Sequence, residues 1–199
     1  MKLNTFLTLL IPTGILFLFA CSNNPQMESD SLQKEQAVGL QEYIEQGRSI
    51  SQKMQGILLS NVSGAMQNGG PAHAIAFCNT KAIPLTDSLS KAEGVKISRI
   101  SDKNRNPNNI ASSDELELIN QFKMNNVKDT VLSWDNNENY VYYSTIKTGM
   151  PACMKCHGSV DTDISPETLN ALDSLYPEDK ARNYVLGDFR GLWKIEFVQ

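Results

Sequence analysis

The sequence has few of the residue types that usually build enzyme active sites. Its 199 residues include only two histidines and four cysteines, and no acid–base constellation is recognisable, so we expect no enzyme. Acidic residues outnumber basic ones by 22 to 18, and the net charge of −4 does not suit a nucleic-acid-binding surface. The sequence contains no internal repeat. Its length fits one ordinary domain together with a targeting segment.

Long apolar runs are also scarce, and the one that stands out lies at the N-terminus. Residues 1–20, MKLNTFLTLLIPTGILFLFA, carry Lys2 and then a mostly apolar stretch, which is the layout of a secretory signal. The run ends in LFAC, which resembles the lipobox of bacterial lipoproteins and predicts that Cys21 is acylated and becomes the first mature residue. An uncleaved membrane anchor is the alternative. Ser22 after the cysteine, by the same resemblance, favours the outer membrane.

We therefore expect a domain outside the cytoplasm, held by lipid at the periplasmic face of a bacterial membrane. Removal of residues 1–20 takes away Lys2 and no acidic residue, so the net charge falls from −4 to −5. Residues 21–33 begin with the acylated cysteine. They are polar and without periodicity, and we interpret them as a linker. Residues 34–199 form the predicted domain.

The first part of this domain predicts helices. Apolar residues at three- and four-residue spacing predict a long helix over about 34–67, which Gly69 and Gly70 end. Pro71 suits the first turn of a second helix, and Pro84 predicts a kink or break within it. One face of the second helix, an arc of about 80°, is apolar. It carries Ile75, Cys78, Ala82, Leu85 and Leu89.

The second part predicts a sheet. Alternating and β-branched segments predict four strands, at residues 95–101, 130–134, 140–146 and 192–198. The second and third strands flank the turn-forming stretch DNNEN, which indicates an antiparallel hairpin. Ser112 and Glu115 have the spacing of a capping box, and Ser165 is expected to cap another short helix. In the last strand, we expect Trp193 to face inward and Lys194 outward. The fold class is α+β, an antiparallel sheet with an N-terminal helical layer.

The most specific motif is GMPACMKCHGS at residues 149–159. Two thiols three positions apart, at Cys153 and Cys156, suit covalent addition to the two vinyl groups of one porphyrin, and the adjacent His157 then ligates the iron. Each residue of the motif has a separate task in this interpretation. The export signal supports it, because bacterial c-type haem is attached outside the cytoplasm. The motif therefore predicts one covalently bound haem c.

Three other chemistries fit the same residues less well. A thioredoxin-like dithiol needs Cys-x-x-Cys at the start of a helix in a βαβ unit, and no such pattern surrounds this stretch. A structural zinc site needs four ligands, which Cys153, Cys156, His157 and Cys78 would have to supply, although zinc sites usually use spaced pairs. A local disulfide without further function is the third alternative.

The sequence pattern does not identify the second ligand of the iron, on the side opposite to His157, as clearly. His73 and Cys78 lie five residues apart and therefore about 140° apart on one helix, so they cannot both face one iron. Cys78 lies in the apolar arc and is favoured over His73, which lies near the polar side. A buried free cysteine is an equally good interpretation of Cys78. Methionine is a further option. The candidates are Met54, Met66, Met124, Met150 and Met154.

Four stretches together resemble a known family. They are AIAFCNTKAIP, ISRISDKNRNPNN, YYSTIKTGMPACMKCHG and YPEDKARNYVLGDFRG. In this order they are similar to the single-haem, PAS-like c-type haem domains, which occur alone or as the extracytoplasmic part of sensor kinases and chemotaxis receptors. The resemblance covers roughly residues 34–199.

The resemblance implies a PAS-like antiparallel sheet and a specific set of haem contacts. Cys153 and Cys156 would hold the haem, and His157 and Cys78 would ligate its iron. Arg105 and Arg190, which lie in matching stretches, are candidates to pair with the haem propionates because guanidinium groups suit carboxylates. An equally good interpretation is that both arginines hold loops in place.

These features predict a membrane-tethered mono-haem c-type cytochrome that carries single electrons to and from a redox partner protein. The alternative is a sensor of redox state or of a diatomic gas, in which the Cys78 ligand leaves the iron and a partner protein receives the signal. A thiolate favours ferric iron, whereas a protonated thiol is a poor ligand for ferrous iron. The fate of this ligand therefore separates a carrier from a sensor.

Overall fold

The computed structural model describes residues 25–135 and 139–197. The expected signal at residues 1–20 and the expected lipidation site, Cys21, lie outside these ranges. Within the described ranges, none of the helices combines the length and the apolar character that crossing a bilayer requires.

The chain divides into two units, residues 1–36 and residues 37–199. In the first unit, residues 25–36 are helical, whereas we expected an irregular linker up to residue 33. Pro25 occupies the start of this helix, where proline is well tolerated, and good helix formers such as Gln, Glu, Leu and Lys follow it. The second unit contains the sheet and the candidate site.

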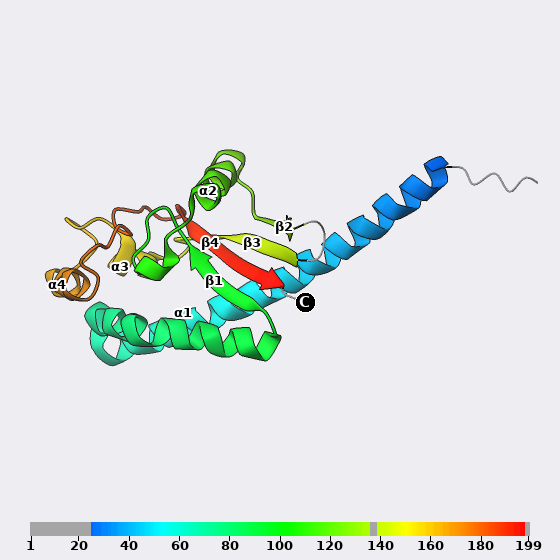
Figure 1. Cartoon of the computed structure of the whole chain (residues 1–199). Helices are drawn as coiled ribbons and strands as arrows, with labels where there is room; N and C mark the ends of the chain where they lie inside the picture. Colours follow the sequence, from blue (N-terminus) through cyan, green and yellow to red (C-terminus); the bar gives the residue numbers. More distant parts are fainter. Residues whose placement is uncertain (1–24, 136–138, 198–199) are drawn as a thin grey trace, which may run out of the picture. The chain divides into compact units, whose positions relative to one another are not determined.

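Helix α1 (Pro25–Glu93) consists of two helices that meet at Gly69 and Gly70, as predicted. Gly70 has a φ of 74°, a backbone conformation that favours glycine. Of the predicted kink or break near Pro84, the break is wrong, because the backbone stays helical through this residue, and the kink stays a prediction. Buried Ala82 and Leu89 pack on both sides of the proline, and this packing offsets the lost hydrogen bond. Figure 1 shows the second helix returning alongside the first on one face of the sheet.

Four strands form one antiparallel sheet, which confirms the α+β class. The strands are β1 (Lys96–Ile100), β2 (Asp129–Asp135), β3 (Asn139–Lys147) and β4 (Phe189–Phe197). Their order in the sheet is β1-β4-β3-β2, and every neighbouring pair is antiparallel. The predicted antiparallel pairing is confirmed for β2 and β3, and residues 136–138 between them lie outside the described ranges.

Helices cover both faces of the sheet. Trp193 and Ile195 face α1, and a core of Ile50, Met54, Leu58, Ala82, Leu89, Ile97 and Tyr142 surrounds them. On the other face lies α2 (Ser113–Asn125), whose predicted capping box at Ser112 is present. Lys194 points to this second face, away from Trp193, as predicted. It is partly buried and donates to Glu115 of α2 over 2.9 Å, because α2 covers the face to which it points.

The remaining helices lie beyond one end of the sheet (Figure 1). They are η1 (Pro107–Asn109), α3 (Pro151–His157) and α4 (Pro166–Leu175). Ser165 caps α4 as predicted, through its side chain and the backbone N–H of Thr168. Leu172 and Tyr176 pack against Ile75 of α1, and Cys156 contacts the same apolar cluster. The motif at residues 149–159 is therefore packed between the second helix of α1 and the end of the sheet.

The close packing of α1 on the sheet gives a stability prediction at Gly47. A Cβ added at this position would overlap the ring of Tyr142, which is fully buried. We expect Gly47→Ala to lower the free energy of unfolding by about 1–3 kcal/mol, the usual cost of overpacking. Gly56→Ala is the matched control, because nothing lies within 4 Å of its added Cβ. It should raise stability by up to about 1 kcal/mol. Urea unfolding followed by circular dichroism measures both, and equal effects of the two variants would contradict the packing argument.

Candidate functional site

The Cys-x-x-Cys-His motif forms α3, a two-turn helix that follows directly on β3. Buried Thr148 fixes the approach to this helix, since its hydroxyl donates to the carbonyl of Val185 over 2.7 Å. Pro151 stands at the first helical position, and the N–H of Gly158 closes the end by donating to Met154 O. The helix therefore presents its two cysteines and its histidine on a short, rigid element at the end of the sheet.

His157 is held in one tautomer. Its Nδ1 lies 2.8 Å from the carbonyl oxygen of Ala181. A carbonyl only accepts, so Nδ1 carries the hydrogen and Nε2 is left with a free lone pair. Burial, with the nearby charges of Arg105 and Arg190, holds the pKa of His157 well below its usual range. The imidazole is therefore neutral, which is the form that ligates metals.

The two motif cysteines do not have the properties of a redox dithiol. Cys153 and Cys156 are free thiols. Burial raises the pKa of Cys156 to about 11, whereas a reactive dithiol needs a lowered thiol pKa. The sheet is antiparallel throughout and offers no βαβ unit. Both observations argue against a thioredoxin-like dithiol.

The zinc and disulfide interpretations also find no support in the geometry. Among the described residues, no three His, Cys, Asp or Glu side chains are grouped so that they could hold a metal ion. Cys78, Cys153 and Cys156 are all unpaired thiols, so none of them forms a disulfide. The motif is left with the combination that suits a covalently attached haem: two free thiols and a neutral, oriented imidazole.

Cys78 lies on the same side of the domain as the motif. It is partly buried on the second helix of α1 and close enough to Cys156 for its charge to affect the pKa of that thiol. Burial raises the pKa of Cys78 itself, and the charges of Arg99 and Arg105 act against this rise. The competing candidate His73 is exposed. The structure therefore brings Cys78, and not His73, towards the motif.

The methionine candidates separate clearly by their surroundings. Met54 is fully buried in the core between α1 and the sheet, in a cluster that contains no residue of the motif. Met124 is 76% exposed near the end of α2. Met150, Met154 and Met66 are partly or largely accessible. Met154 is partly buried and belongs to α3 itself, two positions before Cys156, so among the candidates away from the motif only Cys78 has a partly buried place close to that thiol.

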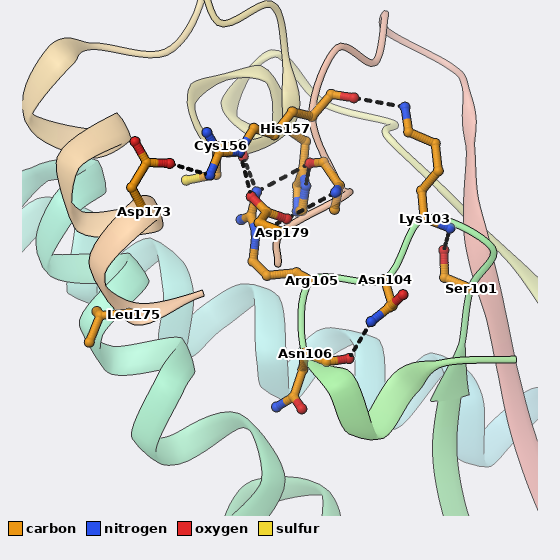
Figure 2. Close-up of polar contacts among 12 residues, drawn as sticks. Ser101, Lys103, Asn104, Arg105, Asn106, Cys156, His157, Asp173, Leu175 and Asp179 are labelled. Atoms are coloured by element: carbon orange, nitrogen blue, oxygen red, sulfur yellow. Dashed lines mark hydrogen bonds and ion pairs between the residues drawn. The ribbon is translucent and has the colours of Figure 1, made fainter. Parts of the chain in front are cut away.

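Arg105 ties the motif to the loop that precedes β4. Figure 2 shows it reaching from the segment between β1 and η1 to the motif and to Asp179. Its Nε pairs with Asp179 Oδ1 over 3.1 Å, and its Nη2 donates to the carbonyls of Cys156 and Ala181. These contacts use most of the guanidinium, which matches the loop-holding interpretation of Arg105. Its pairing with a propionate stays a prediction.

Asp179 is the centre of this polar network. Its side chain has no solvent exposure, and it accepts from Arg105, from Arg182 Nε at 2.9 Å and from the backbone N–H of Ala181 at 2.9 Å. Burial alone would raise the pKa of Asp179, but the charge and hydrogen bonds of Arg105, with the other donors, outweigh it and lower the pKa. Asp179 therefore stays ionised and fixes the loop whose carbonyl holds His157.

Two further arginines lie near the motif, and among the described residues neither forms an ion pair with a carboxylate. Arg190 Nη1 donates to Ser101 and to Lys103 O, while its buried Nε meets no hydrogen-bond partner in the described part of the chain. Arg99 lies on the sheet face towards α1, with its guanidinium 5.7 Å from the centre of the Trp193 ring. Burial lowers the pKa of both arginines, which is the sign of cations short of an anionic partner.

The motif search did not assign roles to Asp179, Ala181 and Arg99. A signal was present, because Asp179 and Ala181 belong to the stretch YPEDKA and Arg99 to ISRIS, two of the four stretches that carry the family resemblance. Arg105, from the same stretch as Arg99, meets Asp179 across 74 positions of sequence, and the motif stretch supplies His157. The structure shows that three separate stretches meet around His157.

The fold and the site define a class of protein: α+β domains in which a bent helical layer covers an antiparallel sheet and a Cys-x-x-Cys-His helix follows the third strand. The comparisons with known proteins agree. The family described as Tll0287-like matches residues 26–197, and the chain belongs to this family. No curated protein matches the chain.

A solved structure with the same fold is the crystal structure of the cyanobacterial haem protein Tll0287. The two chains superpose with a TM-score of 0.60 and share 18% sequence identity, over 79% of this chain and 96% of that chain. At this identity the likeness shows the fold.

Proposed function

We propose that this chain is an extracytoplasmic mono-haem c-type cytochrome. Cys153 and Cys156 attach one haem covalently, and His157 ligates its iron from one side. The observation that carries the proposal is the 2.8 Å hydrogen bond from His157 Nδ1 to Ala181 O, because it leaves Nε2 free on a neutral imidazole next to two free thiols. Membership of the Tll0287-like family and the fold shared with a haem protein support the same conclusion.

A haem in this site supplies one-electron chemistry, and the protein residues prepare it for that task. Cys78 would be the second protein ligand of the iron, as its placement near Cys156 supports. Arg190 and Arg99 are the guanidinium groups with capacity left for the propionates, since Arg105 is already bound to Asp179. The protein has no catalytic role of its own in this proposal.

The remaining features of the proposal concern location and partners. The sequence pattern around Cys21 supports a lipoprotein at the periplasmic face, with the outer membrane favoured, and a redox partner protein that exchanges electrons with it. The four family stretches support a relationship to the PAS-like haem domains of sensor kinases and chemotaxis receptors. A sensor is the alternative function, because burial raises the pKa of the Cys78 thiol and so favours its release from ferrous iron.

Covalent attachment is tested first. We expect the full chain, produced with c-type haem maturation proteins, to carry one haem that remains bound in a denaturing gel and resists extraction into acidified organic solvent. Replacing Cys153 and Cys156 together by serine should abolish the attached haem. The matched control is Cys78→Ser, which should keep it. Haem that extracts from the unchanged protein would refute covalent binding.

A further inference from the structure

The carbonyl oxygen of Ala181 receives two donors at once. His157 Nδ1 lies 2.8 Å from it and Arg105 Nη2 lies 3.2 Å from it. A carbonyl has two lone pairs, so it accommodates both. A cation at one lone pair draws electron density from the oxygen and makes it a weaker acceptor for the other donor. The hydrogen bond to His157 is therefore weaker than the same bond would be without Arg105.

The position of Arg105 is fixed by buried partners. The side chain is 10% exposed, and its Nε is bound by Asp179, whose side chain is 0% exposed. The same Nη2 also donates to the carbonyl of Cys156, inside the motif itself. Asp179 in turn accepts from the N–H of Ala181 over 2.9 Å, so carbonyl, cation and carboxylate belong to one small unit. Arg105 cannot leave the carbonyl without giving up the buried ion pair.

We propose that Arg105 is a positioning residue that tunes His157 through the shared Ala181 carbonyl and raises the reduction potential of the bound haem. The inference rests on the proposed function, in which His157 ligates a covalently held haem. A strong acceptor at Nδ1 makes a ligating histidine more basic, and a more basic ligand favours ferric iron. Arg105 weakens that acceptor, so ferrous iron becomes easier to form.

The surroundings offer a comparison that separates this effect from charge alone. Arg182 is a second cation on the same carboxylate, with Nε 2.9 Å from Asp179 Oδ2 and Nη2 2.6 Å from Asp173. Its side chain makes no contact with the Ala181 or Cys156 carbonyls among the contacts of the described residues. Arg105→Gln and Arg182→Gln therefore each remove one positive charge next to Asp179, but only the first releases the shared carbonyl.

The experiment measures the haem-loaded full chain by spectroelectrochemical titration. Arg105→Gln should lower the midpoint potential by about 59 mV, equivalent to about a tenfold change in the ferric-to-ferrous ratio at one ambient potential. Arg182→Gln should change it much less. A second readout is the His157 Nδ1–H proton resonance of the reduced protein, which should move downfield in Arg105→Gln as this hydrogen bond strengthens. Arg105→Lys keeps the charge without the fork and should give a smaller shift in the same direction.

The outcomes are distinct. A lower potential with a moved Nδ1–H resonance in the Arg105 variants, and neither in Arg182→Gln, supports the inference. Equal potentials in both glutamine variants, or an unmoved resonance, overturn it while the attached haem still supports the proposed function. If Arg105→Gln does not fold, the same two readouts on Arg105→Lys decide in the same way. Absence of attached haem from the unchanged protein would instead refute the proposed function.

Discussion

Cys78→Ala is expected to change the ferric absorption spectrum from that of a six-coordinate low-spin haem while the haem stays attached. The thiolate contributes negative charge to the iron and favours its ferric state, so its loss should also raise the reduction potential. Axial ligands move haem potentials over a range of about 0.8 V, which makes this one of the largest effects available to a single substitution in the domain. Spectra of both oxidation states and a redox titration measure it.

His73→Ala is the matched control for Cys78→Ala. Both residues lie on the second helix of α1, but His73 is exposed and Cys78 is partly buried near Cys156. The histidine variant should leave spectrum and potential unchanged. An unaltered low-spin spectrum in Cys78→Ala would remove Cys78 from the iron. Mixing the reduced unchanged protein with carbon monoxide then separates the two functions, since rapid binding favours a sensor and no binding favours an electron carrier.

Local signals predicted the elements of this fold well. Glycines at 69 and 70, the capping box at Ser112 and the turn-forming stretch between the second and third strands are signals that act on their immediate neighbours. The structure confirms the helix end, the cap and the antiparallel pairing of β2 with β3. The continuation of the helix through Pro84 and the pairing of Lys194 with Glu115 were not predicted, for a common reason. Both depend on what packs against the residue, namely the core under α1 and the helix α2, and neither partner is near in sequence.

The site residues likewise fall into two groups, those that local sequence predicts and those that only the fold brings together. Cys153, Cys156 and His157 are neighbours in sequence, so their spacing alone indicates their chemistry. The residues that orient His157 come from elsewhere in the sequence. Arg105 precedes Cys156 by 51 positions, and Ala181 follows His157 by 24 positions. Helical periodicity placed Cys78 in an apolar arc, but only the packing of α1 against α4 and the motif brings it near Cys156.

Asp179→Asn is expected to destabilise the protein by about 3–5 kcal/mol at neutral pH, because it leaves the buried Arg105 without a carboxylate and Arg182 with only the exposed Asp173. The pKa of Asp179 is lowered in the folded state, so its contribution is complete above the unfolded pKa of about 3.9. It is lost as the pH falls through the folded value, where the carboxyl binds a proton. Urea unfolding of the unchanged protein and of Asp179→Asn from about pH 2 to 7 measures the difference.

Asp173→Asn tests whether burial is the cause of this effect. Asp173 pairs with the same Arg182 at 2.6 Å, but its side chain is 64% exposed. An exposed ion pair contributes about 0–1 kcal/mol, so this variant should be nearly as stable as the unchanged protein at every pH. The difference between the unchanged protein and Asp179→Asn should be constant above about pH 5 and shrink below about pH 4. If the two variants cost the same, or if the Asp179 difference does not vary with pH, the loop around His157 is held by something other than this buried carboxylate.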